Sequence, residues 1–259
     1  MIGEKIPLFG SGTILTKEML EGIKEYAMAE GKYAYLGYAD GVYSGCKITT
    51  TESEITVNPG IIIFKEQAYY IDKPMTVRYM PTNEWMVFKI SFLGEEKSDT
   101  CILKEIRASL AGENETGSND IELCRFKLQN GARLRYDYRN FKDLITEYDT
   151  IYEISAKWAA YGNASLSPVV LEAFYKEAVK LEGREAVDMM FLHQIAELKG
   201  NTLNRNTILL YLSEKLGWEY KNYENGRIYE GLSEALNRMK HGRNTGAVRE
   251  RRERRIIVD

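Results

Sequence analysis

The sequence predicts an α+β protein: an N-terminal antiparallel β-sandwich or small barrel with a short leading helix, followed by a small helical domain. From Cys46 to about Arg139, apolar and polar residues alternate with a period of two. After Phe141 the apolar period lengthens to that of a helix. Alternation is typical of antiparallel strands with one buried face, whereas the longer period is typical of amphipathic helices. The change of period therefore separates two structural parts.

This reading divides the 259 residues into four segments, and the length suits two domains. Residues 1–15 form an N-terminal arm, 16–140 a β-rich domain, 141–242 a helical domain and 243–259 an Arg-rich tail.

The leading helix is predicted from its cap and its apolar face. Thr16 is a suitable N-cap, Glu18 lies in the first turn, and Gly31 is a plausible stop. The apolar residues that fall on one face are Met19, Leu20, Ile23, Tyr26 and Ala27.

The β-rich domain should contain about eight strands, a number typical of a sandwich or small barrel. Its first part, 38–72, predicts an initial turn through Asp40-Gly41 and Ser44-Gly45, then strands on either side of the turn Asn58-Pro59-Gly60. The run 61–64 is continuously apolar, so we expect that strand to be buried on both faces. Alternating strands are expected at 86–92, 123–128 and 133–139, and the polar stretch 111–120 should be a mobile hairpin tip.

Five helices are predicted in the second half. The first spans 141–158, on the spacing of its apolar residues from Phe141 to Trp158. The second begins at Ser167-Pro168, with Leu166 and Leu171 as a hydrophobic staple, and is interrupted or ended by Gly183. The third includes Val187, Met190, Phe191, Ile195 and Leu198. The fourth spans 205–216 with Gly217 as its stop, and the fifth spans 228–239.

No residue pattern predicts catalysis, a cofactor or a metal, so the expectation is that this protein is not an enzyme. Cys46, Cys101 and Cys124 lack metal-binding spacing and are expected to be small buried apolar residues. His193 and His241 are too isolated for a zinc site. The sequence contains no phosphate loop, dinucleotide fingerprint or hydrolase motif. Acidic pairs such as Glu95-Glu96 lie in loop-like stretches, where solvated charge is the simpler interpretation.

The tail from Arg243 to Asp259 has six Arg against two Glu and one Asp, and allows three interpretations. It could bind phosphates, with a helix-turn-helix ahead of it, although residues 141–242 hold 12 basic against 15 acidic residues. It could dock as an added edge strand on a neighbouring subunit, or it could be a terminus without a role. Docking is favoured, and its candidate residues are Arg249, Arg251, Arg252, Arg254, Arg255, Ile256, Ile257 and Val258.

Two further patterns bound the location and the contacts of the chain. No apolar run approaches the roughly 20 residues of a membrane helix, and no apolar signal-peptide segment follows Met1. We therefore expect a protein made in the cytoplasm. Its 18 Tyr against 8 Phe suit either wet interfaces or half-exposed sheets.

The segment from Gly41 to Asp72 resembles a β-rich module of baseplate and tail-fibre attachment proteins of Gram-positive phages and of phage-tail-like contractile bacteriocins. The matching residues are Gly41 to Cys46, then Ile55 to Ile61, then Tyr69 to Asp72, and the resemblance extends over roughly 37–138. The resemblance implies a structural subunit of a phage tail or tail-like particle that attaches fibres or receptor-binding proteins to a baseplate.

The implied partners are other tail or baseplate subunits, a fibre or receptor-binding protein, and further copies of the chain in a symmetric assembly. The termini, including the arm Met1–Leu15, are the expected docking segments, so a chain truncated after Gly242 should fold but not assemble. Two alternatives remain: a nucleic-acid-binding protein that uses the Arg-rich tail, and a glycan-binding module that stacks sugars on Tyr, Trp85 or Trp218.

Overall fold

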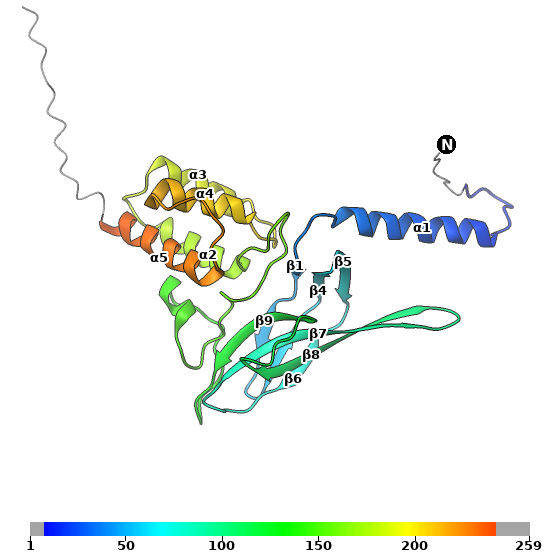
Figure 1. Ribbon diagram of the computed structural model, residues 1–259, viewed down its shortest axis with the longest axis horizontal. Coiled ribbons are helices and arrows are strands. Elements are labelled where there is room, and N and C mark those ends of the chain that lie inside the picture. Colours follow the sequence, from blue (N-terminus) through cyan, green and yellow to red (C-terminus); the bar gives the residue numbers. More distant parts are fainter. Residues whose placement is uncertain (1–7, 242–259) are drawn as a thin grey trace, which may run out of the picture.

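The computed structural model describes residues 8–241 and confirms the α+β class (Figure 1). A helix leads the chain, β-sheets follow, and a group of helices completes it. The sheets and the helices have separate hydrophobic cores. The elements are α1 Lys17–Ala34, β1 Gly41–Gly45, β2 Ile48–Thr50, β3 Glu54–Val57, β4 Gly60–Phe64, β5 Gln67–Ile71, β6 Met75–Arg78, β7 Trp85–Lys97, β8 Ile102–Gly112, β9 Asp120–Lys127, the 3-10 helix η1 Phe141–Ile145, α2 Pro168–Ala178, α3 Ala186–Ala196, α4 Arg205–Leu216 and α5 Asn225–His241.

The strands form three antiparallel sheets of three strands each, in the orders β1-β4-β5, β2-β3-β6 and β8-β7-β9. None of these described sheets closes on itself, so the barrel alternative does not apply to them. Side chains from all three sheets meet in one core, with Ile55, Ile62 and Phe88 fully buried. The predicted burial of 61–64 is confirmed for Ile62, Ile63 and Phe64, while Ile61 is half-buried.

The predicted initial turn at 40–45 is wrong, because Gly41–Gly45 is strand β1. Its glycines are there for close approach between backbones. Gly45 lies opposite Gly60 of β4, and a Cβ on Gly60 would clash with the backbone of Cys46 and Ser44. A Cβ on Gly41 would clash with the carbonyl of Lys157. The glycine spacing in this segment therefore reflects packing of three backbone segments.

The stretch 111–120 is not a hairpin tip, because β8 and β9 both pair with β7 and not with each other. Its loop crosses a face of β7 instead, from Gly112 opposite Met86 to Asp120 opposite Ser91. Lys89 Nζ of β7 donates to the Glu115 carbonyl at 2.7 Å and to Asp120 at 2.8 Å. Because Lys89 is buried, this pair of contacts fixes the crossover.

The helical part matches the sequence prediction in its caps. Ser167 caps α2, which has Pro168 at its start, and Gly217 ends α4 with φ of 74°. Helix α2 packs on α3 and α5, and α4 packs on α3 and α5. Helix α2 ends at Ala178, so Gly183 lies in the loop beyond it. Of the apolar residues predicted for the third helix, Met190 is exposed.

The predicted helix over 141–158 is wrong. Only Phe141–Ile145 is helical, as the 3-10 helix η1, and the chain is then extended. Its backbone bonds go to strands: Tyr152 and Arg125 of β9 exchange bonds of 2.8 and 2.9 Å, and Ala159 N donates to Val42 of β1 at 2.7 Å. Asp149 is left-handed at φ of 61°, which no helix interior allows.

The apolar spacing misleads here because the segment serves two cores. Phe141, Leu144 and Ile154 belong to the helical core. Ile151, Ala156 and Trp158 belong to the β core. An apolar stripe produced by one helix face looks the same in sequence as a chain that alternates between two cores.

The strand predicted at 133–139 is also wrong, because its residues form a single bridge between Arg135 and Thr150. Apolar and polar residues still alternate there, because successive side chains face different parts of the molecule. Leu134 is buried in the β core, while Arg135 turns the other way to bind η1.

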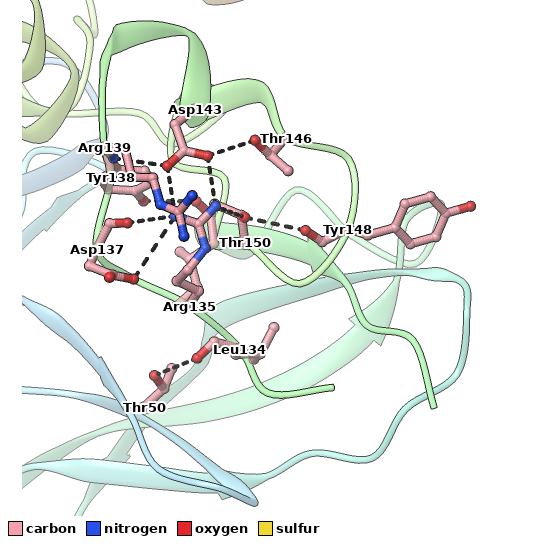
Figure 2. A network of polar contacts seen from close by, with 11 residues as sticks. Thr50, Leu134, Arg135, Asp137, Tyr138, Arg139, Asp143, Thr146, Tyr148 and Thr150 are labelled. Carbon is pink, nitrogen blue, oxygen red and sulfur yellow. Dashed lines mark hydrogen bonds and ion pairs between the residues drawn. The ribbon is translucent and has the colours of Figure 1, made fainter. Parts of the chain in front are cut away.

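Arg135 is the centre of a polar network that joins the two parts (Figure 2). Its Nη1 and Nη2 each donate to one oxygen of Asp143, both at 2.6 Å, and Nη2 also donates to Thr150 at 3.0 Å. Asp143 accepts further bonds from Arg139 N and Thr146 Oγ1. The Arg135 guanidinium holds the pKa of Asp143 well below its ordinary value.

Gly60→Ala should lower the free energy of unfolding by about 3 kcal/mol, because the new methyl group meets backbone and not a flexible side chain. Denaturant titration measures this. Gly226→Ala is the matched control: it lies in α5 with open space around its Cα, so it should change stability by no more than about 1 kcal/mol. Equal effects would contradict the close-approach explanation.

Asp143→Asn should cost about 2 kcal/mol of stability at neutral pH, since a charged bidentate pair is lost. A carboxyl with a depressed pKa stabilises the fold above its ordinary pKa, and that contribution disappears as the pH falls below it. The difference from the unchanged protein should therefore shrink on acidification. Asp137→Asn is the control, because Asp137 is exposed and lies 4.0 Å from Arg135. A difference that does not depend on pH would argue against the pair.

Candidate assembly surface

The docking residues predicted in the tail, Arg249 to Val258, lie outside the described residues, as do residues 1–7 of the predicted arm. Their roles stay predictions. The described part of the chain ends with α5 at His241. The remaining part of the arm, 8–15, is described and is exposed throughout.

The described arm and α1 together carry a concentration of exposed apolar side chains, which we call the N-terminal surface (residues 8–36). Twenty-two large apolar side chains are exposed among the described residues, and ten of them lie in this stretch. Leu8 and Ile14 are 83% and 82% exposed, and Leu20 and Ile23 of α1 are 51% and 44% exposed. Contiguous apolar exposure of this kind is typical of an interaction site.

Helix α1 begins as predicted, with Thr16 Oγ1 accepting from Met19 N, but it continues past Gly31 to Ala34. Figure 1 shows it projecting from the body, with only its C-terminal end near β5. The apolar face found in the sequence is therefore real, and its side chains Leu20 and Ile23 remain about half exposed to solvent. Sequence could locate this face and had no means of showing that it stays uncovered.

An aromatic cluster fixes the direction in which α1 projects. Tyr35 packs edge-on against Tyr43 of β1 at 4.9 Å between ring centroids, and Tyr38 does so at 5.4 Å. Tyr161 contacts Tyr38 and covers Gly37, which has φ of 83°. Burial, and then nearby Tyr70, raise the pKa of Tyr35. Several of the abundant tyrosines thus form a packed cluster that anchors the base of the helix.

The far ends of β7 and β8 form a second projection, a hairpin that extends on the same side of the molecule as α1 (Figure 1). Leu93, Ile102 and Leu103 are about half exposed there. Cys101 lies at the tip and is exposed, so its predicted burial is wrong. Cys46 and Cys124 are buried as predicted, and burial raises the pKa of both thiols, that of Cys46 to about 12.

A cleft of about 650 Å³ lies between β1 and α2, and buried Glu153 contributes to its lining. Glu153 Oε2 accepts from Ser167 Oγ at 2.6 Å. Burial raises the pKa of Glu153, and the Ser167 and Tyr136 side chains oppose that rise. Glu153 therefore connects the extended segment that follows η1 to Ser167, the N-cap of α2.

The residues proposed for sugar stacking are engaged with neighbours. Trp85 packs edge-on against Tyr152. Trp218 lies against Gly231, and the Arg227 guanidinium lies 4.3 Å from its ring centroid. Within residues 8–241, no helix has the length and apolar character to span a membrane, and no acidic, Cys or His residues cluster as a metal site would require.

Neither the known protein families nor the curated proteins contain a match to this sequence. Among solved structures, the fold is similar to a crystal structure of TssK, with a TM-score of 0.41 and 10% identity over 90% of this chain and 70% of that one. A chain of the TssK–TssF–TssG baseplate subcomplex of the type VI secretion system gives 0.40 and 9% over 93% and 99%. These likenesses, each with a TM-score below 0.5, establish neither the family nor the function of this chain.

Glu153→Gln should make stability less sensitive to rising pH. A group whose pKa is raised by folding contributes most below its ordinary pKa, and the contribution is lost as the pH rises through the raised value. The free energy of unfolding should be measured from acidic to mildly alkaline pH. As the pH rises, the value for the Gln variant should increase relative to that of the unchanged protein. Glu172→Gln, at an exposed position paired with Lys176, should show no such gain.

Proposed function

We propose that this protein is a structural subunit of the baseplate of a phage tail or another contractile, tail-like particle, and that it has no catalytic role. The observation that carries the proposal is the N-terminal surface. Ten large apolar side chains remain exposed on the N-terminal surface of the folded protein. Exposure of this kind indicates that another protein binds there.

The resemblance of Gly41–Asp72 to tail and baseplate modules supports the same class. The glycines of that segment have a structural reason. At Gly41, Gly45 and Gly60, backbones approach too closely to leave room for a side chain. The module is therefore a rigid platform, and it holds the base of α1 through Tyr43.

The proposed partners are neighbouring baseplate subunits, with a fibre or receptor-binding protein as the component that the particle finally presents. One of the structures compared above is the TssK–TssF–TssG baseplate subcomplex of the type VI secretion system. We propose that this chain works in a machine of that broad class, and its exposed N-terminal surface supports binding to a neighbouring subunit. Manufacture in the cytoplasm and assembly into the particle complete the proposal.

Co-sedimentation with particles tests this function in a strain whose native gene is replaced by variants. The unchanged protein should sediment with particles. Deleting residues 1–15, or truncating after Gly242, should leave a folded protein that remains in the supernatant, since either change removes a proposed docking segment. A Lys157→Ser variant, altered at an exposed position on the body, should sediment normally.

Two outcomes would count against the proposal. If the unchanged protein never sediments with a particle, the assembly role fails. If the chain truncated after Gly242 sediments normally, the tail is not a docking segment, and a shift assay with duplex DNA then tests whether its arginines bind phosphate in a salt-dependent way.

A further inference from the structure

The first part of α1, from its N-cap Thr16 to Ala29, follows a heptad pattern. With Thr16 at position a, the positions a, d, e and g through Ala29 contain no charged residue. After Thr16 these positions hold Met19, Leu20, Gly22, Ile23, Tyr26, Ala27 and Ala29. The apolar a and d positions are Met19, Ile23 and Tyr26, and Glu30 occupies the next a position. Apolar residues at successive a and d positions are typical of helices that pack against other helices.

The charged residues of the same window occupy only the remaining positions. Lys17 and Lys24 are at b, Glu18 and Glu25 are at c, and Glu21 is at f. Lys17 Nζ lies 3.5 Å from Glu21 Oε1, and both side chains are on the exposed side of the helix. The separation between an apolar face and a charged face is therefore complete for the first three turns, apart from Met28 at f.

The order of these charges selects a parallel arrangement of helices. When identical helices pack in parallel, the b side of one lies beside the c side of the next. Lys17 and Lys24 would then flank Glu18 and Glu25 of the neighbouring copy, with opposite charges adjacent. In an antiparallel pair, b would flank b and c would flank c, so that like charges meet. Charge complementarity thus favours a parallel partner with this same sequence.

The width of the face indicates how the helices would pack. Apolar or small residues at e and g, beyond those at a and d, produce a broader stripe than a two-stranded seam requires. Gly22 and Ala29, at g, allow close approach on one flank, and Leu20 and Ala27, at e, cover the other. Each helix can therefore contact a neighbour on both flanks.

We propose that α1 packs in parallel against α1 of other copies of this chain, forming a helical bundle that joins the subunits. The inference rests on the proposed function, since it names a second copy of the chain as one partner of the N-terminal surface. The body does not obstruct such a bundle, because α1 projects from it and meets it only near its C-terminal end (Figure 1).

Cysteine cross-linking in the purified full-length protein tests the bundle. Cys101 is first changed to Ser, because it is the exposed thiol of the described residues. Met19→Cys at d and Ile23→Cys at a are then introduced separately, with Glu21→Cys at f as the matched control on the opposite face. Under mild oxidation, both seam variants should form covalent dimers and the control should not. An antiparallel pair could bring at most one of the two seam positions next to its own copy.

Solution mass provides the second measurement. Light scattering should give a multiple of the 29.8 kDa chain mass for the unchanged protein. Leu20→Ser with Ile23→Ser should weaken association by roughly tenfold or more for each lost apolar side chain and leave a monomer. Glu21→Ser with Met28→Ser, both at position f, should remain associated. Circular dichroism verifies that each variant is folded.

A monomeric unchanged protein, or cross-linking at Glu21→Cys as strong as at Ile23→Cys, would overturn the bundle. Neither result depends on particles, so the two proposals fail independently. If the protein sediments with particles but is monomeric and uncross-linked in solution, the assembly role stands and α1 binds a different subunit.

Discussion

The structure depends on one shared segment, 141–160, and on the ion pair that holds its beginning in place. Arg135 and Asp143 form two bonds of 2.6 Å, and with Asp143 so fixed, η1 is turned toward the helices. The chain then returns to fill the β core with Ile151 and Trp158. Because one short segment contributes residues to both cores, the sheets and the helices hold each other in a defined orientation. That orientation also sets the direction of the projecting elements.

The sequence predicted most of the fold wherever one element serves one core. Ser167 with Pro168, Gly217 and the turn at Asn58-Pro59-Gly60 are local signals, and each was confirmed. It failed at 133–158, where successive residues face different cores, since a single-period test assumes one buried side. The loop at 111–120 was misread for a similar reason: turn chemistry shows where a chain bends, but not which strands it connects.

The candidate surface was only partly predictable. Its apolar residues and the cap at Thr16 could be read directly, yet an apolar helix face normally implies burial in the same chain. Whether that face is covered depends on the direction of α1. This direction is set by contacts of Tyr35 and Tyr38, including one with Tyr161, which lies far along the sequence. The excess of Tyr over Phe is thus explained in part by the tyrosine cluster at the base of α1.

The three cysteines differ in their exposure to solvent, and the exposed one provides a natural site for chemical labelling. Cys46 and Cys124 are enclosed and their thiols resist ionisation, whereas Cys101 is exposed at the tip of the β7–β8 hairpin. A thiol-reactive dye or gold cluster should therefore attach there without any engineering. A label at the end of the longest projecting strand pair would act as a pointer, reporting which way the subunit faces within a larger assembly imaged by electron microscopy.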